Sequence, residues 1–164
     1  MISKPMQDAI NEQINKELFS SYLYLSMAAY FADKNLPGFA SWMRVQADEE
    51  REHAMKFYDH LLERGGKVEL KAIAAPEAAW KSDLAAFEAV LEHEKFVTRS
   101  IYSVYEVALK EKDYAAQVML QWFINEQVEE EAHAGEIVEN LKRIEVHDTA
   151  VMMLDHRLGK RGED

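Results

Sequence analysis

The 164-residue chain contains no cysteine, only 6 glycines and only 3 prolines. The lack of cysteine excludes disulfides, thiolate zinc sites, iron–sulfur clusters and a cysteine nucleophile, and it is consistent with a reducing cytoplasm. Because glycine and proline are scarce while 48% of the residues are hydrophobic and 30% are charged, collagen-like and disordered chains are also excluded. The composition predicts a globular, helical, cytoplasmic protein.

Basic residues are in short supply as well. The sequence has 19 Lys and Arg residues and 30 Asp and Glu residues, which gives a net charge of −11. The positive surface of a protein that binds nucleic acid or anionic membranes is therefore missing, and cations are the favoured partners. The longest apolar stretch, residues 22–32, is interrupted by Ser26 and is too short to cross a membrane. The N-terminus has no apolar signal region, so we expect a soluble protein with neither nucleic-acid nor membrane partners.

The few breaks in the sequence divide it into four long segments with helical periodicity. The breaks in the first half are Pro5, Pro37-Gly38, Gly65-Gly66 and Pro76. Since proline and glycine punctuate helices, they predict long helices at about 6–35, 38–64, 83–111 and 114–144. After the last of these, Asp148-Thr149 predicts the cap of a short fifth helix at about 148–159.

The junctions between these helices predict the architecture. Segment 67–82 contains Pro76 and no sustained period, whereas the other two junctions are short, and short junctions join antiparallel neighbours. The prediction is an all-α four-helix bundle made of two antiparallel hairpins and one long crossover. We expect a single domain over 1–164, with the bundle at about 6–144.

Each predicted helix has an apolar stripe that polar residues interrupt near its middle. The interrupting residues are Glu17 in the first helix, Glu50 and His53 in the second, Glu94 in the third, and Gln127 and Glu130 in the fourth. A single offset of 77 residues relates Glu17 to Glu94, Glu50 to Gln127 and His53 to Glu130. The two hairpins are therefore predicted to be related by a pseudo-two-fold axis, with these six side chains converging.

Four carboxylates buried together need cations, since an isolated buried charge costs several kcal/mol or neutralises itself. Carboxylates, an imidazole and an amide oxygen suit iron or manganese better than copper(I) or structural zinc. Di-iron bundles use a Glu from each of two helices and Glu-x-x-His from each of the other two. Here Glu50-x-x-His53 is complete, but Gln127-x-x-Glu130 replaces the second motif, so one metal is predicted to have fewer protein ligands.

Two further sets of residues have alternative interpretations. Glu49, Glu126 and Glu129 adjoin the core stripe and form either an additional cation site or a solvated acidic face. Tyr24 lies one heptad after Glu17 and is either a core tyrosine or a functional one.

Three runs of residues resemble the motifs of the non-haem bacterial and archaeal ferritins. They are Ser-Ser-Tyr-Leu-Tyr-Leu-Ser-Met at 20–27, Glu-Glu-Arg-Glu-His-Ala-Met at 49–55 and Asn-Glu-Gln-Val-Glu-Glu-Glu at 125–131. The resemblance covers essentially the whole chain and implies a ferritin-like bundle that assembles into a 24-subunit shell. In that family a buried ferroxidase centre oxidises Fe(II) with O₂ or peroxide, and ferric mineral is stored in the cavity.

The resemblance also implies roles for residues of this chain. It assigns one iron to Glu17, Glu50 and His53 and a second to Glu94 and Glu130, with Glu50 bridging and Gln127 near the second iron. It places a possible third iron site at Glu49, Glu126, Glu129 and Glu130. Tyr24 corresponds to the family's tyrosine beside the centre.

Related families fit less well. Bacterioferritins hold haem with a Met beside the Glu-x-x-His motif, whereas Arg51 and Glu52 lie between Glu50 and His53, so no haem is expected. The short mixed tail at 159–164 is unlike the basic tails of small DNA-protecting relatives, and the lack of cysteine excludes a rubrerythrin-like iron domain. The remaining alternatives to iron storage are a soluble di-iron oxidase or peroxidase without storage, and a purely structural bundle.

Overall fold

The computed structural model describes residues 1–144 and 146–163, and this part of the chain contains five helices and no strand. The helices are α1 (Lys4–Asp33), α2 (Pro37–Glu63), α3 (Asp83–Lys110), α4 (Tyr114–Ile144) and α5 (Asp148–Leu158). The predicted all-α bundle with a short C-terminal helix is confirmed. Glu145 and Asp164, which the predicted domain includes, lie outside the described residues.

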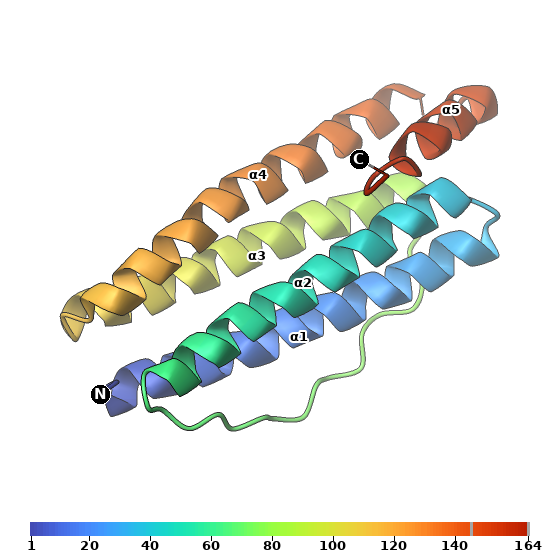
Figure 1. Ribbon diagram of the computed structural model, residues 1–164. Helices are drawn as coiled ribbons and strands as arrows, with labels where there is room; N and C mark the ends of the chain where they lie inside the picture. The colour runs from blue at the N-terminus through green and yellow to red at the C-terminus, as the bar shows by residue number, and fades with distance from the viewer. Residues whose placement is uncertain (145, 164) are drawn as a thin grey trace.

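The helices form two antiparallel hairpins, α1 with α2 and α3 with α4 (Figure 1). The connection between α2 and α3 runs along the length of the bundle (Figure 1). Helix α3 therefore begins at the opposite end of the bundle from the point where α2 finishes. Helix α5 lies across the far end of the bundle, where it contacts both α2 and α4. The long crossover predicted from Pro76 therefore has the expected course.

Local capping explains why α1 begins two residues earlier than predicted. The hydroxyl of Ser3 accepts a hydrogen bond from the backbone N–H of Met6 at 3.4 Å, and Pro5 fits the first turn, where its missing N–H costs nothing. Beyond the end of α1, Asn35 adopts a left-handed φ of 57°, which turns the chain sharply into α2.

The predicted cap of α5 is wrong by one residue, because His147 occupies the N-cap position and no side chain accepts a capping hydrogen bond there. Tertiary contacts hold α5 instead. The carboxylate of Asp155 accepts a hydrogen bond from the backbone N–H of Phe39 at 2.8 Å. A β-carbon on Gly38 would lie 1.7 Å from the backbone oxygen of Asp155, so only glycine permits this close approach.

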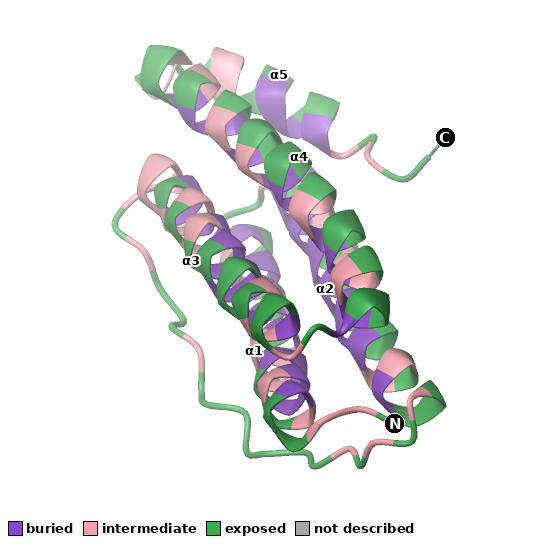
Figure 2. Cartoon of the chain, turned by 90° about the vertical axis from the view of Figure 1, so that its left-hand side faces the viewer, coloured by how far each residue is buried: buried purple, intermediate pink, exposed green. Residues whose placement is uncertain are grey.

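Two apolar clusters fill the bundle, one on each side of its middle. The cluster next to α5 includes Phe31, Phe39, Met43, Phe87 and Leu141. The cluster at the other end includes Ile10, Phe57, Leu61, Ile101 and Phe123. Figure 2 shows the buried residues on the inward faces of the helices. Each fully buried side chain of this size contributes roughly 1.5–3 kcal/mol, so both ends of the bundle are firmly packed.

A polar belt separates the two clusters. We use this name for seven of the buried polar residues between them, which are Glu17, Gln46, Glu50, His53, Glu94, Gln127 and Glu130. All six polar positions that the sequence singled out as converging are members of it. None of the described helices is both long and apolar enough to cross a membrane.

Candidate metal centre

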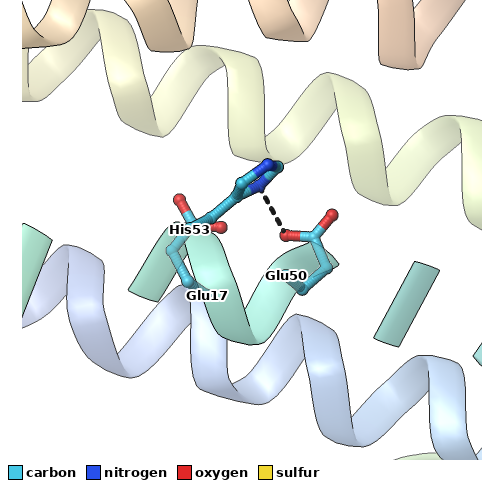
Figure 3. A group of neighbouring side chains, drawn as sticks. All are labelled: Glu17, Glu50 and His53. Carbon is cyan, nitrogen blue, oxygen red and sulfur yellow. Dashed lines mark ion pairs between the residues drawn. The ribbon is translucent and has the colours of Figure 1, made fainter. Parts of the chain in front are cut away.

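The first half of the polar belt is a three-residue group from α1 and α2. Glu17, Glu50 and His53 each offer a ligand atom, and these atoms lie within 4.8 Å of one another (Figure 3). Nδ1 of His53 is 3.5 Å from Oε2 of Glu50. Because the motif Glu50-x-x-His53 spaces its residues by one helical turn, both side chains lie on the same face of α2. All three are almost fully buried, at 1%, 0% and 5% exposure.

Two carboxylate oxygens in this group accept no hydrogen bond. They are Oε2 of Glu17 and Oε2 of Glu50, which form no hydrogen bond with the described residues; the nearest approach to the latter is the 3.5 Å ion-pair contact with His53. Buried polar atoms are almost always satisfied, and an exception calls for an explanation such as a missing ion. A cation between these oxygens and the His53 ring would supply it, since carboxylate and imidazole are ligands for iron.

The second half of the polar belt is centred on Glu94. The hydroxyl of Tyr24 donates a hydrogen bond to Oε1 of Glu94, and the side-chain amide of Gln127 donates to Oε2 at 3.1 Å. The same amide nitrogen also lies 3.2 Å from Oγ1 of Thr98. The predicted partners Glu94, Gln127 and Tyr24 are therefore in direct contact.

Gln46 joins the two halves, and the sequence analysis did not identify it as a site residue. Its side-chain nitrogen donates to Oε1 of Glu50 at 3.1 Å and to Oε2 of Glu130 at 2.9 Å. Gln13 holds Glu17 in the same manner, with its amide 2.8 Å from Oε1. Each glutamine precedes its glutamate by four residues, so a repeated Gln-x-x-x-Glu spacing was the available signal.

Burial disfavours the charged form of every carboxyl group in this cluster. Burial and then the neighbouring charge of Glu50 raise the pKa of Glu17 well above its usual value. Burial and then the charge of Glu94 do the same to the pKa of Glu50. The pKa of Glu94 and that of Glu130 rise to about 7, with burial as the largest cause in each case. At neutral pH the cluster therefore holds protons that a bound cation must displace.

Three of the four acids of the predicted third site lie nearer the surface, whereas Glu130 is buried. Glu49 is 38% exposed and pairs with Arg161, whose Nη2 is 2.6 Å from Oε2 of Glu49. Glu126 is half-buried and Glu129 is exposed. Over residues 1–144 and 146–163, the only compact group of three potential ligands is Glu17, Glu50 and His53. The third site thus stays a prediction.

Fold and site together define a class of protein. A bundle of four long helices with a central cluster of carboxylates and a Glu-x-x-His motif is the architecture of the di-metal carboxylate proteins.

Comparison with known proteins gives the family. The model of the ferritin-like domain family matches residues 7–144. Among curated proteins, the bacterial non-heme ferritin of Bacteroides fragilis is 43% identical over 161 residues, covering 98% of this chain and 100% of the relative. That of Staphylococcus haemolyticus is 40% identical, covering 100% and 99%. The open pore ferritin of Archaeoglobus fulgidus superposes with a TM-score of 0.97 at 52% identity, covering 98% and 99%. The chain belongs to the ferritin family, as the sequence motifs predicted.

Gln46→Met is expected to weaken divalent metal binding at the centre by about tenfold, a typical loss when a partner of a metal ligand is removed. Methionine has a similar length but donates no hydrogen bond, so Glu50 and Glu130 lose their common donor. Anaerobic titration calorimetry with Co(II) measures the dissociation constant. Gln121→Met, at an exposed position of α4, is the matched control and should bind like the unmodified protein. Equal affinity in both variants would show that Gln46 does not position the ligands.

Proposed function

We propose that this protein stores iron, and that it oxidises Fe(II) at the polar belt before storage. The observation that carries the proposal is the buried group of Glu17, Glu50 and His53, with two carboxylate oxygens that form no hydrogen bond with the described residues. Relatives named bacterial non-heme ferritin match the chain over its full length, which supports the same conclusion.

The contacts within the polar belt support a division into two iron positions. Glu17, Glu50 and His53 would hold the first iron, and Glu94 and Glu130 the second. The amide of Gln46 touches both Glu50 and Glu130, which supports Glu50 as the bridging ligand. Gln127 contacts Glu94 and would lie beside the second iron, where it provides a weaker ligand than the histidine of a second Glu-x-x-His motif.

The oxidation needs little from the protein beyond ligands, proton transfer and exclusion of water. Two Fe(II) supply one electron each, and the pair reduces O₂ to hydrogen peroxide with uptake of two protons; peroxide is the alternative oxidant. The carboxylates that lose protons when iron binds offset the charge of the metal. Tyr24, whose hydroxyl donates to Glu94, would fix that ligand beside the centre. Burial and the charge of Glu94 raise the pKa of Tyr24, so the phenol stays protonated.

Storage requires an enclosed space, and we propose a homo-oligomeric shell of 24 subunits in the cytoplasm, without haem. Large apolar side chains are exposed on this subunit, among them Leu25, Tyr114, Val118, Met152 and Met153. Contiguous apolar patches mark interfaces with other chains, and we propose that some of these side chains form such patches in the shell. Met152 and Met153 belong to α5, so the fifth helix would contribute to assembly.

The mass of the native particle, measured before and after addition of Fe(II) in air, tests the proposal. The expected result is a shell of many subunits that takes up far more iron than its centres can bind and keeps it soluble. A monomer or dimer at micromolar concentration that still oxidises Fe(II) would favour the soluble di-iron oxidase. An assembly that neither binds nor oxidises Fe(II) would leave only the interpretation that the protein is a purely structural bundle.

A further inference from the structure

A chain of three hydrogen bonds links Glu17 to a lysine near the surface of the bundle. The ammonium group of Lys16 donates to Oγ of Ser100 at 2.7 Å. The hydroxyl of Ser100 donates to Oε1 of Gln13 at 2.6 Å, and the amide of Gln13 donates to Oε1 of Glu17 at 2.8 Å. Gln13 and Ser100 are buried, whereas Lys16 is half-buried. The chain therefore crosses from α1 to α3 and back, and it ends inside the polar belt.

The two charged ends set the direction of every bond in this chain. An ammonium group has only donors, so the oxygen of Ser100 must accept from Lys16, and the one hydroxyl proton is left for Gln13. The carbonyl end of the Gln13 amide then faces Ser100, and its NH₂ end faces the carboxylate of Glu17. Hydroxyl and amide dipoles that are aligned between a positive and a negative group also strengthen one another.

Ser100 differs in its bonding from two other serines inside helices of this protein. The hydroxyls of Ser20 and Ser103 each donate to the backbone carbonyl four residues earlier, at 3.0 Å, which is a common arrangement for serine within a helix. The hydroxyl of Ser100 donates to Gln13 on the neighbouring helix instead. Without Lys16 this hydroxyl would be free to turn to its own helix, and the Gln13 amide would lose the contact that fixes its direction.

We propose that Lys16 and Ser100 are positioning residues for the first iron position, because they hold the Gln13 amide with its donor end toward Glu17. Oε1 of Glu17 is then occupied, and Oε2, which forms no hydrogen bond with the described residues, is left for the metal. In the reversed direction the amide oxygen would face the carboxylate, and the two acceptors would repel each other. The inference rests on the proposed function, since Glu17 presents a ligand only if the polar belt binds metal.

This arrangement serves only one half of the polar belt. The residue 77 positions after Gln13 is Val90, whose buried side chain has no polar atom. Glu94 therefore has no corresponding glutamine on its own helix, and Tyr24 and Gln127 donate to it instead. Loss of the chain of hydrogen bonds is expected to affect the first iron position much more than the second.

Anaerobic titration with Co(II) tests the inference. Calorimetry gives the dissociation constant of the first equivalent, and the visible d–d absorption of bound Co(II) reports its ligand geometry. In Lys16→Met the first equivalent is expected to bind about tenfold more weakly, a typical loss when a partner of a metal ligand is removed, and its spectrum is expected to change. Ser100→Ala should show the same effects. Lys16→Arg keeps a positively charged donor and should restore most of the affinity and the original spectrum.

The sign of the effect separates positioning from charge. Because Lys16 is a cation, electrostatics alone would make a divalent metal bind more tightly after its removal, whereas the inference requires weaker binding. Lys142→Met is the matched control, since Lys142 is an exposed cation of α4 that pairs with Glu139 at 2.9 Å. Its loss alters the net charge equally, and the variant should bind Co(II) like the unmodified protein.

Other results would overturn the inference. Unchanged or tighter binding in Lys16→Met, or an unchanged Co(II) spectrum, would refute the role of Lys16. An equal loss in Lys142→Met, or a loss that Lys16→Arg does not restore, would refute it as well. Failure of the unmodified protein to bind Co(II) would count against the proposed function itself, and the inference would fall with it.

Discussion

Replacing Glu50 by alanine is expected to slow the first phase of Fe(II) oxidation by about a hundredfold or more, at the upper end of the losses produced by disturbing a metal site. Glu50 is fully buried, belongs to the close group with Glu17 and His53, and accepts a hydrogen bond from Gln46. Its removal takes a ligand from both proposed iron positions at once. Stopped-flow absorbance of the ferric product, at two Fe(II) per subunit in air, measures the rate.

His53→Ala should lose most of the same phase, because it removes the only imidazole in the close group. Glu52→Gln is the matched control for both variants: Glu52 lies in the same run of the sequence but is exposed, so its rate should match that of the unmodified protein. Particle mass must be unchanged in all three. A normal rate in Glu50→Ala or His53→Ala would show that iron is oxidised elsewhere.

Glu130→Gln is expected to stabilise the metal-free protein at neutral pH, by up to about 3 kcal/mol. Burial raises the pKa of Glu130 to about 7 from its ordinary value of 4.5, so between these values the folded protein holds a proton that the unfolded chain has lost. The contribution of Glu130 to stability is therefore fully present below pH 4.5 and is lost as the pH rises through 7. Glutamine removes this dependence because it does not titrate.

The measurement is urea denaturation in the presence of a chelator, from pH 5 to pH 7.5. The difference in unfolding free energy between Glu130→Gln and the unmodified protein should increase with pH over this range. Glu129→Gln changes the same charge at an exposed position of α4 and should alter the unfolding free energy only slightly. A constant difference for Glu130→Gln would mean that its carboxyl group is ionised in the folded state throughout.

Most of the bundle could be predicted from the sequence, because breaks are rare and the helices are long. The fourth helix, for example, was predicted at about 114–144, and α4 has these bounds. The six polar residues were recognisable because each interrupts an apolar stripe, and all six are buried in the polar belt. Their roles as iron ligands stay a prediction.

The contacts that sequence reasoning missed depend on tertiary structure. Arg161 meets Glu49 across 112 positions of the chain, and no periodic pattern in the tail indicates that partner. The cap of α5 was misassigned because Asp148 looks like an N-cap, whereas contacts of Asp155 with Gly38 and Phe39 fix the helix. Gln13 and Gln46 each precede a glutamate by four residues, a pattern that is visible in the sequence. Only their hydrogen bonds to Glu17 and Glu50 show that these glutamines position site residues.

The two apolar clusters on either side of the polar belt have a consequence for how tightly iron is held. Because each end of the bundle is packed by its own large side chains, the ligands are held in place before any ion arrives, unlike those of a zinc finger, which fold around their metal. We therefore expect folding not to depend on metal, so that an ion could leave without collapse of the subunit. Under the proposed function, such a centre would favour passage of iron over its retention, which a protein that oxidises many ions in succession requires.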